Sequence, residues 1–431
     1  MTVADSTTAI ETVFRMEFPR VVASLIRSTG DIDLAEEVAQ DALVDALRQW
    51  PVEGTPTNPG AWLTAVGKRK AIDRFRRNRR LADKYAQIGR ELEREGAPSE
   101  TASVNEDEIG DDRLQLIFVA CHPMLPVAAR VALTLRLVGG LTTTEIARAY
   151  VTSEPTIAQR IVRAKKTLAR ADVAFEVPEG EDRVGRLASV LEVVYLIFNE
   201  GYSATSGEEW LRPELCTEAL RLGRVLAALA PGEPEVHGLA ALMEFQSSRL
   251  VARRGPSGEL VLMDDQDRRT WDRLHIARGE AALRRADELA NSRGPYTLQA
   301  AIAACHCRAL RPEETDRDEL VTLYGELARV MPSPIVELNR AVAISRAWGP
   351  ESALSLVEEI VDLGVLDRYH LLHSVRGDLL DQLGRHAEAG TAFRRAAELT
   401  QNARERDFYE RRAEKSLASI ELAAGAPDGV N

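Results

Sequence analysis

The spacing of hydrophobic residues constrains the fold of this chain more than any other feature. These residues recur at helical intervals along the chain, and no segment alternates apolar and polar residues for long enough to indicate a sheet. The pattern predicts an all-α protein. The helical sequence falls into three blocks, residues 1–90, residues 113–176, and a long Ala-, Leu-, Arg- and Glu-rich block over residues 183–425.

Two breaks separate these blocks. Residues 91–112 are rich in Asp and Glu and contain Gly, Pro and Ser, which predicts a flexible acidic linker. The sequence EVPEGED at 176–182 is a second break. A chain of 431 residues is long enough for two to four domains.

Composition indicates a soluble protein. The charged fraction of 28% and the hydrophobic fraction of 45% are ordinary for globular chains. No apolar run approaches the ~20 residues that span a bilayer. The N-terminal residues lack the basic patch and apolar core of a secretory signal. We therefore expect a cytoplasmic protein with no membrane partner.

An acidic helix is expected over residues 30–51. Asp33 is the expected N-cap, with Glu36 as its capping-box partner. Four acidic residues step by four along one face, and we call them the acidic row: Asp33, Glu37, Asp41 and Asp45, with Gln40 beside them. Like charges at this spacing cost the isolated helix a few tenths of a kcal/mol per pair. The row therefore suggests a basic partner, although a simply solvated face remains the alternative.

A Pro-, Gly-, Asn- and Thr-rich loop is expected at residues 51–60, followed by a strongly basic helix over 61–80. Its apolar residues face a core. The cations that crowd the remaining surface are Lys68, Arg69, Lys70, Arg74, Arg76, Arg77, Arg79 and Arg80. Cations clustered at one helix end are typical of phosphate binding. A membrane-surface helix is less favoured, because Asp73 interrupts the run.

Residues 141–170 have the pattern of a helix-turn-helix. Thr142 can cap a first short helix, with Glu145 closing a capping box, and Ser153 can cap a second helix. The expected buried side of the second helix is Ile157, Ile161, Ala164 and Leu168. The polar residues expected to stay outside are Thr156, Gln159, Arg160, Arg163, Lys165 and Lys166. Arg and Gln can contact base edges, whereas Lys and Thr readily hold phosphates. An ordinary helical hairpin with basic decoration is the alternative.

The last block repeats itself over residues 334–403. Residues with the spacing of a tetratricopeptide helix pair are Gly377, Leu380, Gly384, Ala389, Phe393 and Ala396, and an earlier copy has Ala353, Val357 and Ile360. Stacked helix pairs build extended concave surfaces. An irregular α-bundle is the alternative.

Catalytic, metal and cofactor sites are not expected. Cys305 and Cys307 have no second ligand pair at zinc spacing, so they are interpreted as buried helical thiols. An enzyme reading would use acids and histidines of the block after residue 183, namely Glu200, Tyr202, Glu208, Glu209, His237 and His275. Acids near helix ends are more often caps or exposed charges than catalytic pairs. Tyr195, Phe198 and Tyr202 are interpreted as core residues of an interdomain hinge.

Residues 10–176 resemble the extracytoplasmic-function (ECF) sigma factors of the sigma-70 family. The motif DLAEEVAQDALVDALRQW resembles their region 2 helix, AWLTAVGKRKAIDRFRRNRR their −10-reading helix, and LTTTEIARAYVTSEPTIAQRIVRAKKTL their region 4. The remainder, with VYLIFNEGYSATSGEEWLRPELCTEALRL at 194–222, resembles the subgroup with a long helical C-terminal extension.

The resemblance implies an RNA polymerase sigma factor that is not an enzyme. It implies binding of the polymerase core through Asp33, Glu37, Gln40, Asp41 and Asp45. It implies −10 promoter DNA contacts from Asn58, Trp62, Arg69, Lys70, Asp73, Arg74 and Arg77. It implies −35 contacts from Thr156, Gln159, Arg160, Arg163, Lys165 and Lys166. The 183–425 extension is then expected to regulate activity or to bind a protein partner or ligand.

Two departures from the family pattern limit this transfer. Arg69 stands where many relatives carry Asn, so no −10 base preference is transferred. Val151 replaces a common glycine of the helix-turn-helix turn. The alternative function is a helix-turn-helix transcription regulator with a tetratricopeptide region, which would bind operator DNA without a sigma role.

Overall fold

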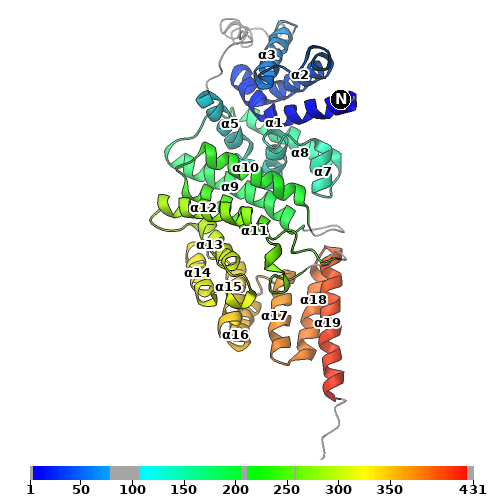
Figure 1. Cartoon of the computed structure of the whole chain (residues 1–431), viewed down its shortest axis with the longest axis vertical. Coiled ribbons are helices and arrows are strands. Elements are labelled where there is room, and N and C mark those ends of the chain that lie inside the picture. The colour runs from blue at the N-terminus through cyan, green and yellow to red at the C-terminus, as the bar shows by residue number, and fades with distance from the viewer. Residues whose placement is uncertain (1–2, 78–105, 205–210, 257–258, 260, 425–431) are drawn as a thin grey trace, which may run out of the picture. The chain divides into compact units, whose positions relative to one another are not determined.

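The computed structural model describes residues 3–77, 106–204, 211–256, 259 and 261–424. Within these ranges the protein is built from α-helices and short 3₁₀ turns and contains no β-sheet, which confirms the all-α prediction (Figure 1). No helix within them is long and apolar enough to cross a bilayer. The chain divides into two compact units, residues 1–197 and residues 198–431.

The first three helices pack on one another at the start of the first unit. They are α1 (Val3–Thr29), α2 (Ile32–Glu53) and α3 (Pro59–Arg77). Their apolar faces form a shared core whose fully buried members include Val21, Val22, Leu25, Val38, Ala42 and Leu63. Helical spacing in the sequence is what brings these residues to one side of each helix.

The start of α2 differs from the prediction. Asp31 is the N-cap, and its carboxylate accepts a hydrogen bond from the backbone N–H of Leu34 at 3.0 Å. Gly30 adopts a positive φ of 66° and ends the preceding helix, so α2 begins immediately after Asp31. The predicted Asp33 cap was therefore wrong, and Glu36 is not its capping-box partner.

The loop after α2 is shorter than the predicted 51–60. Pro51 lies inside α2, which continues to Glu53 and ends at Gly54, whose φ is 88°. Proline is a poor residue for a helix interior, and the sequence interpretation placed the break there for that reason. Residues 54–58 form the actual connection to α3.

Five further helices complete the first unit and lead into the second. They are α5 (Glu106–Ala120), α6 (Val127–Leu137), α7 (Thr143–Ala149), α8 (Glu154–Arg170) and α9 (Gly180–Tyr202). Most of the predicted linker lies outside the described residues, but its last seven positions belong to α5. Asp112 of α5 is buried and pairs with Arg27 of α1 at 3.3 Å, where the two helices pack.

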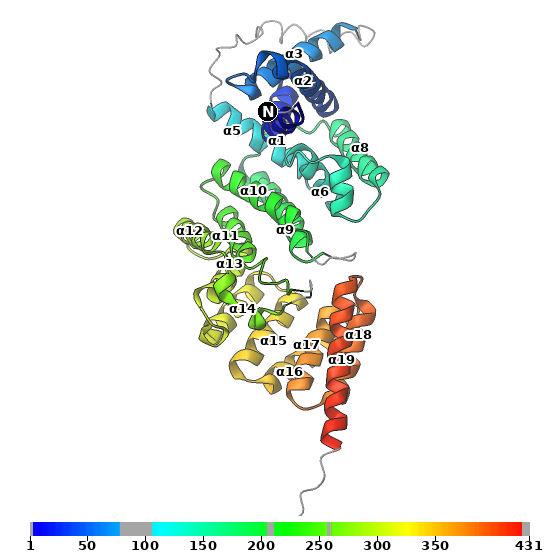
Figure 2. The ribbon, with the colours of Figure 1, turned by 45° about the vertical axis from the view of Figure 1, so that its right-hand side comes forward.

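The second unit is a succession of helices that begins with α10 (Pro213–Leu229) and α11 (Pro234–Ser248). It continues through α12 (Arg273–Leu289), α13 (Pro295–Arg308), α14 (Arg317–Val330), α15 (Pro334–Trp348), α16 (Pro350–Asp362), α17 (His370–Gln382), α18 (His386–Leu399) and α19 (Ala403–Ala424). Each helix from α10 to α18 packs against the next in sequence. Figure 2 shows the last three lying side by side.

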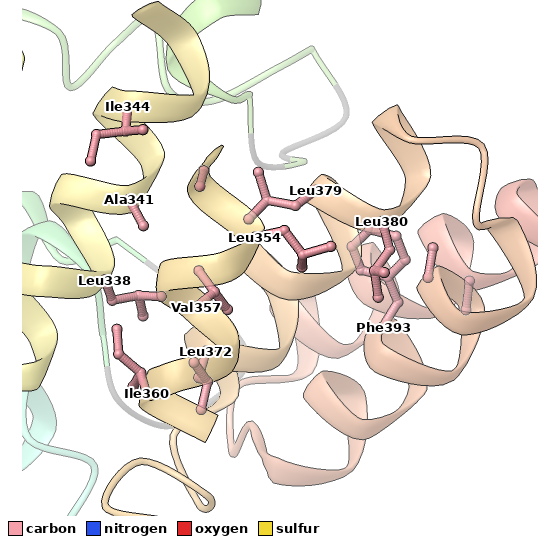
Figure 3. Close-up of a cluster of buried hydrophobic side chains, with 13 residues drawn as sticks. Leu338, Ala341, Ile344, Leu354, Val357, Ile360, Leu372, Leu379, Leu380 and Phe393 are labelled. Carbon is pink, nitrogen blue, oxygen red and sulfur yellow. The ribbon is translucent and has the colours of Figure 1, made fainter. Parts of the chain in front are cut away.

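All of the predicted repeat residues but one are buried on helices α16 to α18, and Gly384 is exposed in the turn between α17 and α18. Figure 3 shows Val357 and Ile360 of α16 in one cluster with Leu380 of α17 and Phe393 of α18. At Gly377, an added Cβ would lie 2.9 Å from the Phe393 ring, so the glycine permits the close crossing of α17 and α18. The assignment of these helix pairs to the tetratricopeptide class stays a prediction.

Candidate nucleic-acid interface

The acidic row lies on the outer face of α2. Asp33 and Glu37 are exposed, and Asp41 and Asp45 are half-buried. The opposite face is buried through Ala35, Val38, Ala39, Ala42, Ala46 and Trp50. Gln40 is exposed beside the row, and its amide donates a hydrogen bond to Glu36 at 3.1 Å.

Helix α3 supplies cations to the acidic row. Lys70 Nζ lies 2.8 Å from Asp45, and Arg74 pairs with Glu37 and lies 4.0 Å from Asp41. The hydrogen bond from Arg74 lowers the pKa of Glu37. The basic partner that the row was expected to need is therefore present, at least in part, within the chain itself.

The predicted −10 residues differ in how far they are engaged in contacts. Arg69 and Asp73 are exposed, while Lys70 and Arg74 are half-buried beside the acidic row. The side chain of Arg77 and all of Arg79 and Arg80 lie outside the described residues.

The loop that precedes α3 is anchored by two local contacts. Asn58 is exposed, and its side-chain oxygen accepts a hydrogen bond from the N–H of Ala61 at 3.0 Å. Trp62 is half-buried and meets Trp50 edge-on, with ring centroids 5.3 Å apart. These contacts fix the end of the loop against α2, and part of each side chain stays accessible.

Helices α7 and α8 form the predicted helix-turn-helix. The Thr142 hydroxyl and the Glu145 carboxylate form a complete capping box at the start of α7. Ser153 caps α8, and the predicted buried face of α8 is confirmed for Ile157, Ile161, Ala164 and Leu168. Val151 holds the turn between the helices with a φ of 46°, a region that β-branched residues rarely adopt.

Most of the predicted outer face of α8 is accessible. Gln159, Arg163 and Lys166 are exposed, and Thr156 and Arg160 are half-buried. The Thr156 hydroxyl lies 2.7 Å from the Ser153 hydroxyl, next to the N-terminus of α8. Three polar side chains are thus available on one helix for contacts with DNA.

Lys165 was expected on that outer face and is instead buried, with 7% exposure. Its ammonium lies 2.9 Å from the Asp33 carboxylate and donates a hydrogen bond to Glu36. Arg136 of α6 reaches the same Glu36, with Nε 2.5 Å from the carboxylate oxygen. A buried ammonium needs such partners, because removing an unpaired charge from water is costly.

The long-range contacts of Glu36 are a feature of this region that sequence reasoning missed. It was interpreted as a local capping partner, yet it is buried and accepts from two cations far away in sequence. An open cavity of about 280 Å³ lies beside this cluster. Residues of α2, α6, α7 and α8 line it, including Asp33, Glu36, Glu37, Gln40, Arg136, Thr143 and Lys165.

The residues that an enzymatic function would use take part in separate contacts. Glu200 pairs with Arg212, and His275 Nδ1 lies 2.6 Å from the buried Glu244. The guanidinium carbon of Arg253 lies 3.6 Å from the centroid of the Tyr202 ring. Glu208 and Glu209 lie outside the described residues. Within the described ranges no three metal-ligating side chains gather.

The four cysteines are buried free thiols. Burial raises the pKa of Cys305 to about 12, which leaves its thiol protonated at neutral pH. Phe198 is fully buried, as expected of a core residue, and stacks on Tyr202 with ring centroids 5.8 Å apart. Tyr195 and Tyr202 are only half-buried, and the hinge stays a prediction.

Comparison with known proteins identifies three family matches. Residues 13–81 match sigma-70 region 2, and residues 115–168 match sigma-70 region 4. Residues 186–287 match a family of unknown function, DUF6596. An uncharacterized protein of Rhizobium meliloti (strain 1021) is 46% identical over 389 residues, which cover 90% of this chain and 91% of the relative.

Proposed function

We propose a role for each surface from the premise that this chain belongs to the sigma-70 family and is an RNA polymerase sigma factor of the extracytoplasmic-function type with a DUF6596 extension. We assign polymerase binding to the acidic row of α2. Members of this family bind the polymerase core and promoter DNA and are not enzymes. The proposed contact residues are Asp33, Glu37, Gln40, Asp41 and Asp45. The observation that carries this assignment is the row itself, four carboxylates on the solvent side of one helix.

We assign −10 recognition to α3 and its preceding loop. Asn58 and Trp62 stand at the start of α3, where a base flipped from the stack could be held, and such a base needs compensating contacts. Arg69, Lys70, Asp73, Arg74 and Arg77 continue along the helix. Arg69, in the middle of α3, is exposed, which supports its assignment to a phosphate or base contact.

We assign −35 recognition to α8. Exposed Gln159 and Arg163 have the chemistry for base edges, and exposed Lys166 for a phosphate. Thr156 and Arg160 lie on the same helix. Helix α8 is capped at its N-terminus and follows the short capped helix α7. This is the helix-turn-helix arrangement in which the later helix reads the major groove.

For the C-terminal unit we propose a regulatory or partner-binding role. Its successive helix pairs are of the kind that builds extended binding surfaces. The region 2 match favours this sigma assignment over a helix-turn-helix regulator, which would not need α2 or α3.

Run-off transcription with purified core polymerase tests these assignments. We expect the full-length protein to support initiation. Asp41→Arg should raise the dissociation constant for the core at least tenfold, which corresponds to a loss of about 1.4 kcal/mol of binding free energy. Glu410→Arg in α19 has the same charge change and serves as the matched control. Unchanged core binding by Asp41→Arg would contradict the assignment of the row.

A chain truncated after residue 178 tests the extension. If its helix content and core binding are retained, a change in promoter output relative to the full chain supports a regulatory role. Equal output from both proteins would remove the direct regulatory role under those conditions.

A further inference from the structure

The cations of region 4 reach the surface proposed to bind the polymerase. Lys165 of α8 pairs with Asp33 and Glu36, and Arg136 of α6 pairs with Glu36. We propose that the free chain is closed on itself, with region 4 docked on α2 so that docking and polymerase binding exclude each other. This inference rests on the proposed polymerase-binding role of the acidic row.

The docking contact is specific rather than a loose surface pair. Glu36 and Lys165 are each 7% exposed, and two cations converge on the single Glu36 carboxylate. Charges taken out of water are tolerated only where good geometry and further hydrogen bonds satisfy them. Glu36 meets this condition, because Gln40 also donates to its carboxylate.

A second ion pair joins the same two regions elsewhere. Asp112, at the start of the region 4 helices, is buried against Arg27 of α1, and α5 packs along α1. Figure 1 shows α5 beside α1. Region 4 is therefore held to region 2 at two separate places, and the Lys165 contact is the one that involves α2.

The docked helix and a polymerase would use the same residues. Asp33 is a proposed polymerase contact and already binds Lys165. Glu37 and Gln40, two further proposed contacts, line the cavity together with Lys165. A basic polymerase surface that binds Asp33 would therefore compete with Lys165 of α8 for the same carboxylate.

Displacement has a second consequence for DNA binding. While it pairs with Asp33 and Glu36, the Lys165 ammonium cannot contact a phosphate. Polymerase binding at α2 would free this cation. The closed state thus couples exposure of one proposed DNA contact to engagement of the polymerase core.

Core binding by charge variants tests the closed state. Only the open fraction binds, so opening the chain lowers the apparent dissociation constant. We expect Lys165→Glu to bind the core roughly fivefold or more tightly than the unmodified chain. Arg170→Glu makes the same charge change at an exposed position of the same helix, outside the proposed contact residues, and is expected to leave core affinity unchanged. Lys165→Met, which removes the charge and keeps a side chain of similar length, provides a second variant if Lys165→Glu does not fold.

Carboxylate labelling in the absence of polymerase tests the contact directly. With a water-soluble carbodiimide and an amine, buried Glu36 should react several-fold more slowly than exposed Glu37 in the unmodified chain. Lys165→Glu and Lys165→Met should accelerate labelling of Glu36, and Arg170→Glu should not.

The two measurements separate the possible failures. Unchanged core affinity in both Lys165 variants, or Glu36 labelling as fast as Glu37 in the unmodified chain, would overturn the closed state. Protection of Glu36 with no core binding by any protein would instead overturn the polymerase assignment of α2, and the proposed competition with it. Tighter core binding together with faster Glu36 labelling supports the proposal.

Discussion

Lys165 Nζ of α8 lies 2.9 Å from the Asp33 carboxylate of α2, although the two residues are 132 positions apart in sequence. With Lys70 and Arg74 of α3, this contact gives every carboxylate of the acidic row a cation within the chain. A protein of net charge −12 therefore keeps several of its proposed DNA-binding cations close to its own acids. Such pairing reduces nonspecific attraction to nucleic acid in the free state.

Glu36→Ala should destabilise the first unit by about 3 kcal/mol, because it leaves two cations facing a site without their shared anion. Thermal unfolding followed by calorimetry measures this as a lowered Tm of the first transition. Glu37→Ala removes an exposed partner of Arg74 and should cost under ~1 kcal/mol. Equal losses in both variants would contradict the buried role of Glu36.

Val151→Gly should stabilise region 4 by about 1 kcal/mol, because glycine adopts the observed φ of 46° without the Cβ clash of valine. Val162→Gly is the matched control within α8, where the same substitution should cost several tenths of a kcal/mol. Urea unfolding of both variants should show shifts of opposite sign. A loss of stability in Val151→Gly would indicate that the turn does not adopt this conformation.

Gly238→Ala should destabilise the second unit by about 2 kcal/mol through overpacking. A Cβ at this position would lie 2.7 Å from the backbone nitrogen of Thr297, where α11 crosses α13. Gly325→Ala in α14 meets nothing within 4 Å and should be stabilising by up to ~1 kcal/mol. The two melting temperatures should therefore move in opposite directions, and a neutral Gly238→Ala would rule out the close crossing.

His306 should make the second unit sensitive to acid. Burial, together with the neighbouring Arg249 and Arg268 guanidinium groups, lowers the pKa of His306 to about 3. The unfolded chain takes up a proton near pH 6.5 and the folded chain does not, so stability falls as the pH drops below about 6.5.

Between pH 7.5 and pH 5.0 this residue should account for up to about 2 kcal/mol of lost stability. Urea unfolding at the two pH values measures the loss, and His306→Gln should show a smaller one. The same pH dependence in both proteins would exclude His306 as its source.

Lys166→Ala should weaken binding of the full chain to duplex DNA of any sequence and reduce the magnitude of its salt slope by about one. Filter binding or anisotropy over a series of salt concentrations gives the slope. Glu154→Ala, at the exposed first turn of α8, removes an anion instead and should not reduce the slope. An unaltered slope in Lys166→Ala would place Lys166 away from the phosphates.

Local features of the sequence were sufficient to predict the helix-turn-helix. Thr142, Glu145 and Ser153 act on backbone N–H groups within three residues, so their roles can be recognised from spacing alone. The burial of the repeat residues around Phe393 was predictable for the same reason, because a helical period determines which residues share a face.

Long-range electrostatics could not be predicted in the same way. Glu36 has a plausible local partner three residues before it, and its true partners, Lys165 and Arg136, are set by how two helical regions pack. Lys165 has the spacing of an exposed residue, yet a distant carboxylate pair draws it inward. Pro51 misled the interpretation in the opposite direction, because a helix-breaking residue is tolerated in α2.

The succession of neighbouring contacts from α10 to α19 determines how a disturbance would spread in the second unit. Because each helix packs on helices one or two places away in sequence, and α19 packs on α18, loosening of α19 would affect α18 before any earlier helix. Such an array can fray from one end, and it can lengthen or shorten by a helix pair during evolution while the remaining pairs keep their packing.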